Sequence, residues 1–441
     1  MVKRPRVVIV GAGFGGLQAA QSLAGAGADV LLIDRNNYHT FVPLLYQVAT
    51  AQLAPEQVVY PVRTILRKAS NIQFRLAEVQ RVDFSAQFVE TEDAVIPYDY
   101  LVLATGSQTQ FLGVPGATEH AFSMKTLEEA VALRNHIFAC FEQAAHESDA
   151  LRRQQLLTIV IVGGGPTGVE MAGALVEVLR GRLRQDYPTL DWRQVRLVLV
   201  QAGDRPLADL PKKLGVYTCQ RLCQLGVEVY LQTRVKRVTP GAVHLQDQTI
   251  LTETVIWTAG LEASPPETSD ELSRATKGKL LVRPTLQLLE QSNVYAIGDL
   301  AYVRQNGVPL TGVAPEALQQ GVTVARNIRL QLQGRAPKPF NYFNKGRLAI
   351  IGCFSGVGKI GVFAFTGFLP WLMWLGVHLV YLPGYRNRLL VFITWLHSYL
   401  LGDRAIPIIF APSRTAVRKR VTLQEAMLDT AGDRQKGGDE G

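Results

Sequence analysis

The chain has 441 residues, and 46 Lys and Arg against 37 Asp and Glu leave a formal net charge of +9. An apolar fraction of 47% with 19% charged residues excludes a disordered chain, and four cysteines with no CxxC pair exclude a disulfide scaffold and predict no metal site. The basic balance favours an acidic partner, either nucleic acid or an anionic membrane surface.

The chain opens with a short basic segment that runs straight into a predicted strand over residues 7–10. No uncharged segment of the kind found in a signal peptide precedes this strand, so we expect the protein on the cytosolic side of any membrane it contacts.

A glycine cluster follows the first strand, and a helical pattern follows the cluster. Gly11, Gly13 and Gly16 form a GxGxxG, in which the first glycine allows a tight turn, the second lets the backbone approach a pyrophosphate, and the third lets helix and strand pack closely. Asp34 ends the next predicted strand, where its carboxylate is placed to bind a ribose hydroxyl pair. These residues predict a dinucleotide site.

The same pattern recurs over residues 159–168, where Gly163, Gly165 and Gly168 repeat the spacing. Buried strands that alternate with helices predict parallel βαβ units, so we expect an α/β fold with two Rossmann-like dinucleotide-binding domains. A strand over 293–299 ends in Gly298 and Asp299, which is typical of a flavoprotein in which the Asp accepts a ribityl hydroxyl. We therefore predict FAD in the first unit and a nicotinamide nucleotide in the second.

Gln201 ends the strand that follows the second loop, where an acid would bind the adenine ribose of NADH and repel a 2′-phosphate. A neutral side chain removes this repulsion, and Arg205 is near enough in sequence to attract a phosphate. One hypothesis is that NADPH is accepted as well as NADH. The alternative is that Gln201 still bonds the ribose and the site stays selective for NADH.

Glu170 lies in the first turn of the helix after the second loop. One interpretation is favourable placement of a carboxylate on the helix dipole, worth about 0.3–1 kcal/mol. The other is a catalytic carboxylate close to the nicotinamide and the flavin that orients the electron donor.

We divide the chain into an FAD-binding domain (1–125, completed by 286–340), a connector (126–155) and an NAD(P)H-binding domain (156–285). A C-terminal region (341–411) and a polar tail (412–441) follow. Within the connector, a polar helical stretch is expected over 126–153.

The C-terminal region is unusually apolar, and residues 360–383 contain no Asp, Glu, Lys or Arg. We predict a sheet that starts near Leu348, a helix over 368–382 and a second helix over 385–401. A helix over 368–382 would be about 22 Å long, too short to span a bilayer. Apolar residues at helical spacing predict that the two helices lie on a membrane, or alternatively face a core or a dimer partner. Aromatic and basic residues fit a lipid interface: Trp371, Trp374, Trp395, Tyr399, Arg404, Arg414, Arg418, Lys419 and Arg420.

Together these motifs resemble the type II (alternative, non-proton-pumping) NADH:quinone oxidoreductases, which are two-dinucleotide-binding flavoproteins of the pyridine nucleotide-disulfide oxidoreductase superfamily. The resemblance covers about residues 5–411, and its most specific parts are residues 11–16, 34–50, 163–170, 298–299 and 314–320. For FAD it implies a site formed by Gly11, Gly13, Phe14, Gly15, Gly16, Asp34, Arg35, Pro43, Leu44, Ala104, Thr105, Gly106, Gly298, Asp299, Ala317 and Leu318. For NAD(P)H it implies Gly163, Gly165, Pro166, Thr167, Gly168, Gln201, Ala259 and Gly260. Its catalytic residues would be Glu170, Gln319 and Gln320.

The resemblance implies hydride transfer from NAD(P)H to the flavin N5, and then transfer of two electrons to a membrane quinone that approaches near Gln319, Gln320 and Ala317. It also implies a peripheral, monotopic enzyme of a respiratory chain on the cytoplasmic face of a membrane. The chain departs from the family pattern at Gln201 and at Pro315, where a glutamine is frequent, and the second departure affects quinone preference. Helix surface polarity is the alternative interpretation of the glutamine pair.

Two other functions stay open: a flavin reductase for a soluble acceptor such as ferredoxin, and a non-catalytic protein that senses FAD and NAD(P)H. The apolar C-terminus favours the quinone enzyme over the first, and Glu170 with Gln319 favours turnover over sensing. Residues 35–60 contain no Cys, so electrons cannot leave through a disulfide there. No basic-aromatic motif supports nucleic-acid binding, and a homodimer is compatible with the apolar face.

Overall fold

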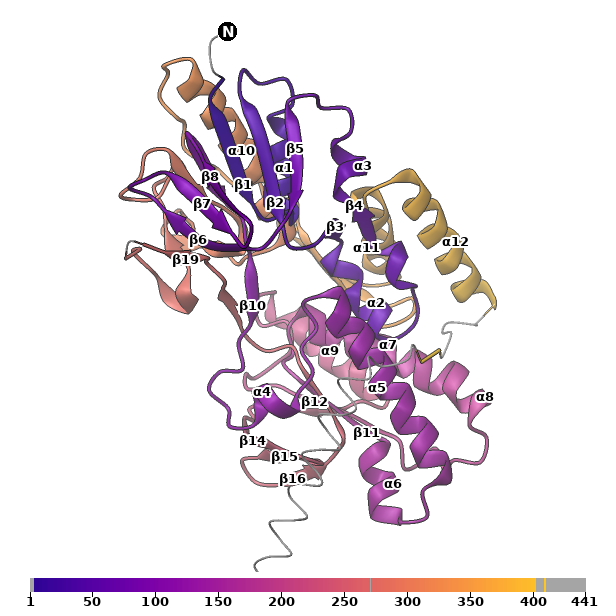
Figure 1. The fold of residues 1–441 in the computed structure, drawn as a ribbon. Coiled ribbons are helices and arrows are strands. Elements are labelled where there is room, and N and C mark those ends of the chain that lie inside the picture. Colours follow the sequence, from indigo (N-terminus) through magenta and orange to yellow (C-terminus); the bar gives the residue numbers. More distant parts are fainter. Residues whose placement is uncertain (1–3, 270, 402–407, 410–441) are drawn as a thin grey trace, which may run out of the picture.

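The computed structural model describes residues 4–269, 271–401 and 408–409. Its first half is built on a five-stranded parallel sheet in the order β21-β9-β1-β2-β5 (Figure 1). The strands are β1 (Arg6–Val10), β2 (Asp29–Asp34), β5 (Ile72–Leu76), β9 (Tyr100–Leu103) and β21 (Val294–Ala296). Helices α1 (Phe14–Ser22) and α10 (Ala314–Leu332) pack against each other beside this sheet, although about 300 residues separate them in sequence. The C-terminal part of the first domain therefore completes a unit begun by the N-terminus.

The second half repeats this plan with a four-stranded parallel sheet in the order β13-β12-β11-β17. Its strands are β11 (Thr158–Val162), β12 (Arg196–Val200), β13 (Glu228–Tyr230) and β17 (Thr254–Trp257), and its main helices are α7 (Pro166–Val178) and α9 (Lys212–Gln224). The two copies agree in register, since Val10 pairs with Ile33 and Val162 pairs with Val200. The predicted α/β architecture with two parallel sheets is confirmed.

Short strands surround these two sheets. Strands β10 (Ser107–Thr109) and β18 (Leu261–Ala263) pair with each other, so the chain begins its return to the first half directly after β17. One mixed sheet contains β6 (Val79–Asp83), β7 (Phe88–Thr91), β8 (Ala94–Pro97) and β19 (Glu267–Thr268). An antiparallel sheet contains β14 (Val235–Thr239), β15 (Ala242–Leu245) and β16 (Thr249–Leu251). The remaining strand pairs are β3 (Tyr38–Thr40) with β4 (Val59–Pro61), β20 (Leu280–Leu281) with β22 (Ala301–Tyr302), and β23 (Arg304–Gln305) with β24 (Val308–Pro309).

The predicted connector is helical. It consists of α5 (Leu127–His146), which begins with a capping box between Thr126 and Glu129, and α6 (Ala150–Leu156), which Asp149 caps. Short helices complete the two halves: α2 (Leu45–Ala49), α3 (Val62–Leu66), α4 (Ala117–His120) and α8 (Arg184–Asp186), which follows a π-helical turn over Leu179–Leu183.

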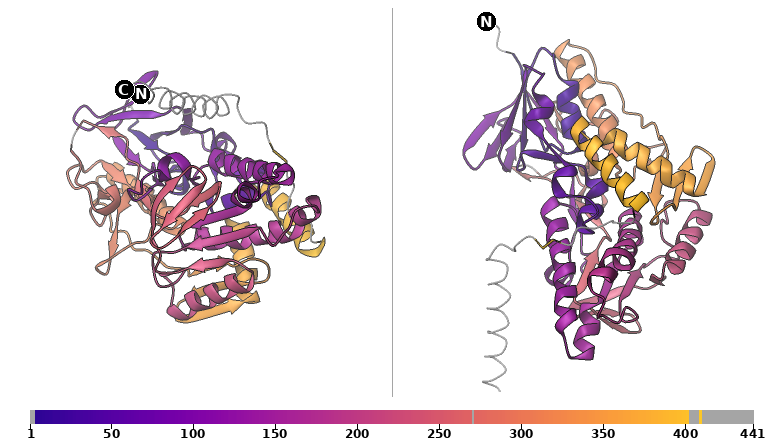
Figure 2. Two further views of the ribbon diagram at one scale, coloured as in Figure 1. Left: turned by 90° about the horizontal axis from the view of Figure 1, so that it is seen from below. Right: turned by 90° about the vertical axis from the view of Figure 1, so that its right-hand side faces the viewer.

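The C-terminal region forms a three-stranded antiparallel sheet and two helices, as predicted. The strands are β25 (Arg347–Ile350), β26 (Gly356–Ile360) and β27 (Phe363–Gly367), and the helices are α11 (Phe368–Tyr381) and α12 (Tyr385–Leu401). The right-hand view of Figure 2 shows both helices lying across one side of the molecule. Asn387 fixes α12 to the first half, because its buried amide lies 3.2, 3.2 and 2.8 Å from the carbonyl oxygens of Glu56, Gln57 and Val59.

The C-terminal helices share a hydrophobic core with the second half of the molecule. Buried side chains of α2, α5, α7 and α11 belong to one continuous cluster, whereas the first sheet has a core of its own. The tryptophans of the C-terminal helices lie inside this cluster. The prediction that Trp371, Trp374 and Trp395 lie at a lipid interface is therefore wrong, since all three are buried in the protein.

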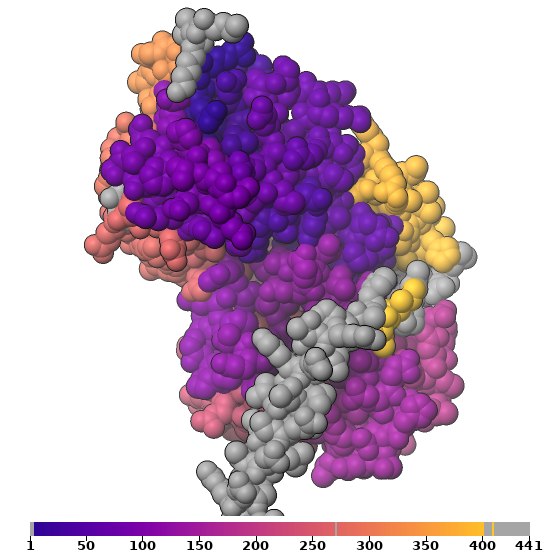
Figure 3. Space-filling model, in the orientation of Figure 1, coloured from indigo at the N-terminus to yellow at the C-terminus, as the bar shows by residue number. Residues whose placement is uncertain are grey.

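Aliphatic and phenylalanine side chains form the outer face of the two helices instead. On α12 the apolar residues at helical spacing are exposed, except for the half-buried Tyr399. A second group on α11 joins them, which gives nine exposed side chains: Leu389, Phe392, Ile393, Leu396, Leu400, Phe368, Leu369, Leu372 and Val380. Figure 3 shows these C-terminal helices at the edge of the molecule, beside the first half. We call the nine exposed apolar side chains of α11 and α12 the outer apolar face. Within the described residues, no helix combines the length and the hydropathy needed to cross a bilayer. The basic residues predicted to follow α12, from Arg404 to Arg420, lie outside the described part of the chain.

Candidate active site

The first glycine loop connects β1 to α1 in a conformation that requires glycine. Gly11 has φ +104°, and a Cβ on this residue would lie 2.4 Å from the carbonyl oxygen of Ala104. A Cβ on Gly16 would lie 1.9 Å from the carbonyl oxygen of Gly11, so any side chain here would force strand and helix apart. By contrast, a Cβ on Gly13 would meet no described atom within 4 Å, which leaves open space where α1 begins.

Asp34 holds this loop from the end of β2. Its carboxylate accepts hydrogen bonds from the backbone N–H of Ala12 (2.6 Å) and of Asn36 (2.8 Å), and each oxygen keeps a second lone pair for a ribose hydroxyl. Burial raises the pKa of the Asp34 carboxyl, and the two backbone N–H groups oppose that shift. The buried His39 supports the loop as well, because its Nδ1 lies 2.8 Å from the carbonyl oxygen of Ala12 and its ring packs edge-on against Phe14.

Further predicted FAD residues lie close to the first glycine loop. A Cβ on Gly15 would lie 3.3 Å from the carbonyl oxygen of Ala317, and a Cβ on Gly298 would lie 3.6 Å from the Ala317 side chain. Gly298 has φ +71°, and its N–H donates to the buried side-chain oxygen of Gln320 at 2.6 Å. Gln320 therefore fixes the turn that presents Asp299.

Asp299 is partly exposed and is held by two side chains that the sequence did not single out. Ser107 Oγ donates to its Oδ2 at 2.6 Å, and Lys125 Nζ lies 3.3 Å from the same oxygen. Ser107 directly follows predicted site residues 104–106, and this adjacency is the only signal in the sequence that could have found it. Lys125 directly precedes the connector, far from any motif.

These residues fit an FAD group. The open helix N-terminus at Gly13 can receive a pyrophosphate, Asp34 a ribose and Asp299 a ribityl hydroxyl. In addition, the buried hydroxyl of Thr105 has no hydrogen-bond partner among the described residues, as expected of a group that serves a ligand. Three predicted residues lie differently. Arg35 is exposed and pairs with Glu78 at 3.8 Å, while Pro43 and Leu44 belong to a short 3₁₀ turn in which Leu44 is fully buried.

The second loop has the same backbone geometry as the first. Gly163 has φ +112°, a Cβ on Gly168 would lie 1.9 Å from the Gly163 carbonyl oxygen, and a Cβ on Gly165 would meet no described atom within 4 Å. Pro166 starts α7, where its missing N–H costs nothing. Ala259 lies directly beside Gly163, and Gly260 follows it with φ +82°. Among the described residues, no side chain caps α1 or α7, so both helix N-termini are available to a ligand.

Gln201 ends β12 as Asp34 ends β2. Its Oε1 accepts from the backbone N–H of Gly164 at 2.8 Å, and its Nε2 donates to the carbonyl oxygen of Arg205 at 3.3 Å. The Arg205 guanidinium is already engaged, because it pairs with Asp204 at 2.9 and 3.0 Å and donates to the Ala208 carbonyl oxygen.

Glu170 lies one turn into α7, buried below the second loop. Trp374 Nε1 of α11 donates to its Oε1 at 2.9 Å, and the backbone N–H of Ile350 also donates to the carboxyl. Burial raises the pKa of Glu170 to about 8, and both donors act to lower it. This carboxyl is therefore mostly protonated at neutral pH.

The buried carboxyl borders a group of polar side chains in α2 and α12. Gln47 Nε2 donates to the Tyr46 hydroxyl at 2.9 Å, and Trp395 Nε1 donates to Gln47 Oε1 at 2.8 Å. Burial and the Glu170 charge raise the pKa of Tyr46 well above its ordinary value. Tyr46 and Gln47 lie in one of the specific motifs. Trp374 and Trp395 come from the C-terminal region, to which the sequence analysis assigned no site residue.

The two predicted glutamines of α10 differ in their burial and in their hydrogen-bond partners. Gln320 is buried and bonds Gly298, as described above, while Gln319 is partly exposed and pairs with both backbone groups of Phe343, each at 2.9 Å. Leu318 lies beside them, half-buried, and Pro315 occupies the first turn of α10.

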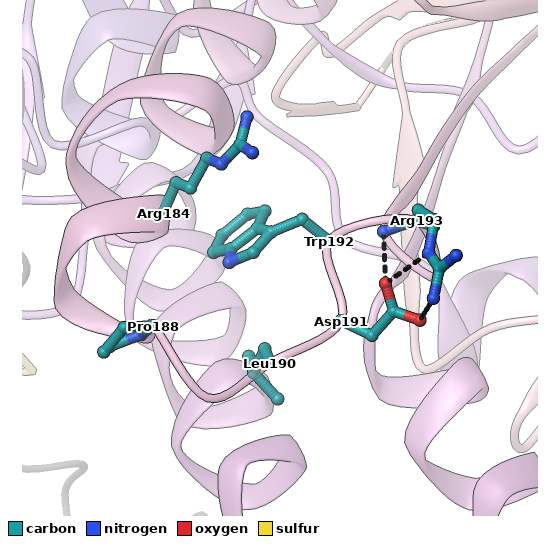
Figure 4. A pocket seen from close by; sticks show the side chains of 6 residues that line it. All are labelled: Arg184, Pro188, Leu190, Asp191, Trp192 and Arg193. Atoms are coloured by element: carbon teal, nitrogen blue, oxygen red, sulfur yellow. Dashed lines mark hydrogen bonds and ion pairs between the residues drawn. The ribbon is translucent and has the colours of Figure 1, made fainter.

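One surface pocket lies away from both loops. It has a volume of about 650 Å³ and is lined by Arg184, Pro188, Leu190, Asp191, Trp192 and Arg193 (Figure 4). The Arg193 guanidinium is paired with Asp191 at 2.9 and 3.0 Å, and none of these residues is a predicted site residue.

Comparison with known proteins identifies relatives along nearly the whole chain. A model of the family "Pyridine nucleotide-disulphide oxidoreductase" matches residues 5–321. Two curated relatives from Mycobacterium tuberculosis (strain ATCC 25618 / H37Rv) are each 38% identical: the type II NADH:quinone oxidoreductase Ndh over 91% of this chain and 89% of its own, and NdhA over 90% and 87%. A type II NADH:quinone oxidoreductase from Staphylococcus aureus (strain NCTC 8325 / PS 47) is 29% identical over 81% and 90%.

Solved structures share the fold. The structure of NDH2 from Plasmodium falciparum in complex with NADH superimposes with a TM-score of 0.84 at 18% identity, over 92% of this chain and 100% of that one. The sulfide:quinone oxidoreductase of Aquifex aeolicus superimposes with a TM-score of 0.66, over 93% of each chain at 18% identity.

Proposed function

The chain belongs to the pyridine nucleotide-disulphide oxidoreductase family and, within it, to the type II NADH:quinone oxidoreductases, and on this premise we propose how its residues divide the reaction. The enzyme transfers electrons from NADH to a quinone through a flavin. The observation that carries this function is the pair of matching glycine loops, each with an open helix N-terminus, in a chain 38% identical to type II enzymes.

The first half is the proposed FAD site. Gly13 and the start of α1 receive the pyrophosphate, Asp34 receives the adenine ribose, and Asp299, aligned by Ser107 and Gln320, receives the ribityl chain. Once bound, the flavin supplies a two-electron acceptor that can take a hydride and pass electrons to a quinone, which amino-acid side chains cannot do.

The second half is the proposed NAD(P)H site. Gly165 and the start of α7 receive the pyrophosphate, and Gln201 faces the adenine ribose. Because Gln201 is neutral, we propose that NADPH is accepted as well as NADH. Arg205 contributes less to this acceptance than its position in the sequence predicts, since Asp204 already neutralises it.

Glu170 is the proposed proton holder of the site. The reaction of NADH, one proton and quinone to NAD⁺ and quinol consumes a proton that the hydride does not provide. A carboxyl whose pKa is about 8 carries that proton at neutral pH and can lose it within the physiological range. Trp374 holds the Oε1 oxygen of this carboxyl, which orients the donor and exchanges the proton.

The quinone is proposed to arrive beside α10. Ala317, Gln319 and Gln320 share the first turns of this helix, and the Ala317 carbonyl oxygen lies next to Gly15 of the first loop. Gln320 acts through the Gly298 turn, whereas Gln319 holds the backbone of Phe343. Pro315 replaces a residue that would carry a side-chain amide, which changes the polarity offered to the quinone ring.

We propose that the enzyme is peripheral and monotopic on the cytoplasmic face of a membrane, with the outer apolar face against lipid. This face exposes nine large apolar side chains on two adjacent helices, more than isolated surface leucines account for. A lipid-soluble quinone would then reach the site from the bilayer. The same face is compatible with a homodimer, which would compete with liposomes for it.

Anaerobic stopped-flow of the purified flavoprotein tests the function. NADH should bleach the flavin absorbance, and a short-chain quinone should restore it within the turnover time. If the protein is instead a reductase for a soluble acceptor, ferredoxin should restore the absorbance and the quinone should not. If it is a sensor, the bleached state should persist with either acceptor.

A further inference from the structure

Glu170 and Trp374 form a hydrogen bond that joins the second half of the molecule to the C-terminal region. The indole Nε1 donates to Oε1 at 2.9 Å, across a separation of 204 residues. Glu170 is 8% exposed and Trp374 is 1% exposed, so water does not compete for this bond. When Glu170 ionises, this bond becomes charge-assisted, and a charge-assisted bond in such a site is stronger than one at the surface.

The indole is held firmly in the orientation that makes this bond. The His378 ring, one turn later on α11, stacks on it with a centroid distance of 3.7 Å and an interplanar angle of 23°. His378 Nδ1 lies 2.7 Å from the Trp374 carbonyl oxygen, which requires the proton on Nδ1. Tyr46 and Trp395 pack around the indole, with ring centroids at 6.2 and 6.1 Å. The N–H therefore has a single direction available.

The groups that face the Glu170 carboxyl are few. Ile350 of β25 and Trp374 of α11 donate to it, and among the described residues no Lys or Arg charge contributes to its pKa shift. The titratable neighbours are Tyr46 of α2 and His378 of α11. Beyond Tyr46 lie Glu177 of α7 and Tyr399 of α12, whose charges act on Tyr46. Burial lowers the pKa of His378 to about 4, so this histidine is neutral and Tyr46 is protonated at neutral pH. With no cation nearby, the two N–H donors are what stabilises an ionised Glu170.

We propose that Trp374 is a positioning residue for the reaction: its indole N–H fixes the Glu170 carboxyl and sets how readily that carboxyl releases its proton. The C-terminal region thus supplies part of the active site in addition to the outer apolar face. The proposal rests on the function assigned above, in which Glu170 holds the proton that quinone reduction consumes.

Trp371 provides a matched control on the same helix. It lies one turn before Trp374 and is buried to a similar extent, but its Nε1 has no hydrogen-bond partner among the described residues. Trp371→Phe and Trp374→Phe remove the same atoms from the same core, and only the second removes a hydrogen bond. A difference in activity or titration between the two variants therefore measures the effect of the hydrogen bond and not the effect of lost packing.

The first readout is the pH profile of kcat with NADH and a short-chain quinone. Loss of the donor destabilises ionised Glu170, so Trp374→Phe should move the alkaline limb of the profile to higher pH by roughly one to two units. The Trp371→Phe profile should overlay that of the wild type. In a Glu170→Gln background, Trp374→Phe should add no shift, because the group that titrates is gone.

The second readout does not depend on turnover. The carboxylic C=O infrared band that disappears in Glu170→Gln should titrate at higher pH in Trp374→Phe than in Trp371→Phe. If Trp374→Phe does not fold, 3-benzothienylalanine at position 374 keeps the ring shape and replaces the N–H by sulfur, and it should give the same shift. Identical titrations in the position-374 and position-371 variants would overturn the proposal. A wild type that reduces no quinone would overturn the assigned function instead, and the infrared titration would still measure the effect of Trp374.

Discussion

Asp34 and Gln201 occupy equivalent places in the two halves of the molecule. Each side chain ends the second strand of its unit and accepts a hydrogen bond from the second residue of its own glycine loop, Asp34 from Ala12 N at 2.6 Å and Gln201 from Gly164 N at 2.8 Å. The loop-supporting bond is thus the same in both halves, but the side chain that accepts it is charged in the first half and neutral in the second.

This equivalence predicts the effect of Gln201→Glu. The new carboxylate can keep the bond to Gly164, because a carboxylate and an amide oxygen both accept. It should repel the 2′-phosphate of NADPH, so kcat/KM for NADPH should fall at least about tenfold (~1.4 kcal/mol) relative to NADH. Steady-state kinetics with both donors measures the ratio. In the wild type, a preference for NADH above roughly a hundredfold (about 2.7 kcal/mol) would contradict the proposed dual acceptance.

Matched substitutions in the two loops should separate the two nucleotides. Gly16→Ala and Gly168→Ala create the same clash, each with a loop carbonyl oxygen at 1.9 Å. Gly16→Ala should give purified protein with little bound flavin, whereas Gly168→Ala should stay yellow and lose reduction by NADH. Absorbance spectra and stopped-flow reduction of both variants check this. The reverse pattern would mean that the nucleotides are assigned to the wrong halves.

The raised pKa of Glu170 predicts a pH-dependent stability. Folding raises this pKa from 4.5 to about 8, so the unfolded chain releases the proton first as the pH rises. The contribution of Glu170 to the free energy of unfolding is full below pH 4.5, falls by at most about 1.4 kcal/mol per pH unit between 4.5 and 8, and is constant above. Glu170→Gln should remove this slope. Guanidinium unfolding midpoints of the two proteins at pH 5 to 8 (~0.5 unit steps) measure it, and parallel curves would contradict the buried protonated carboxyl.

Two charges on the outer apolar face should release the enzyme from lipid. Leu389 and Leu396 of α12 are 58% and 47% exposed, so burying the exposed part of each in lipid is worth about half of the ~1.5–3 kcal/mol that a fully buried leucine contributes. The double variant Leu389→Glu/Leu396→Glu should therefore lower the liposome-bound fraction at least about tenfold in flotation assays, without loss of flavin. Leu151→Glu on α6, where the leucine is 63% exposed, is the control that should bind as the wild type does. Equal retention of both variants would reject this face as the lipid contact.

The sequence predicted the repeated units because their signal is local. Each loop, strand end and helix start lies within about 40 residues, and steric rules at Gly11, Gly16 and their counterparts leave one conformation. The helices α11 and α12 were also predicted closely, but the burial of their tryptophans was not. The α11 segment is apolar on all sides, so periodicity could not tell its inner tryptophans from its outer leucines.

Contacts between distant segments lay beyond sequence reasoning for a similar reason. The bonds from Trp374 to Glu170, from Trp395 to Gln47 and from Lys125 to Asp299 connect residues more than 170 positions apart. No local pattern encodes such a pair. The sequence left two roles open for Glu170, a carboxylate placed on the helix dipole or a catalytic carboxylate. Its burial beneath α11, which keeps the carboxyl protonated, is visible only in the structure.

Helix α11 turns Phe368, Leu369 and Leu372 outward, and it turns Trp371, Trp374 and His378 inward. Any truncation upstream of this helix removes the tryptophan that donates to Glu170, and it also removes the outer apolar face. Loss of activity in such a truncated enzyme would consequently give no information on its membrane attachment. A compound that binds beneath α11 and displaces Trp374 would inhibit the enzyme without contacting a coenzyme.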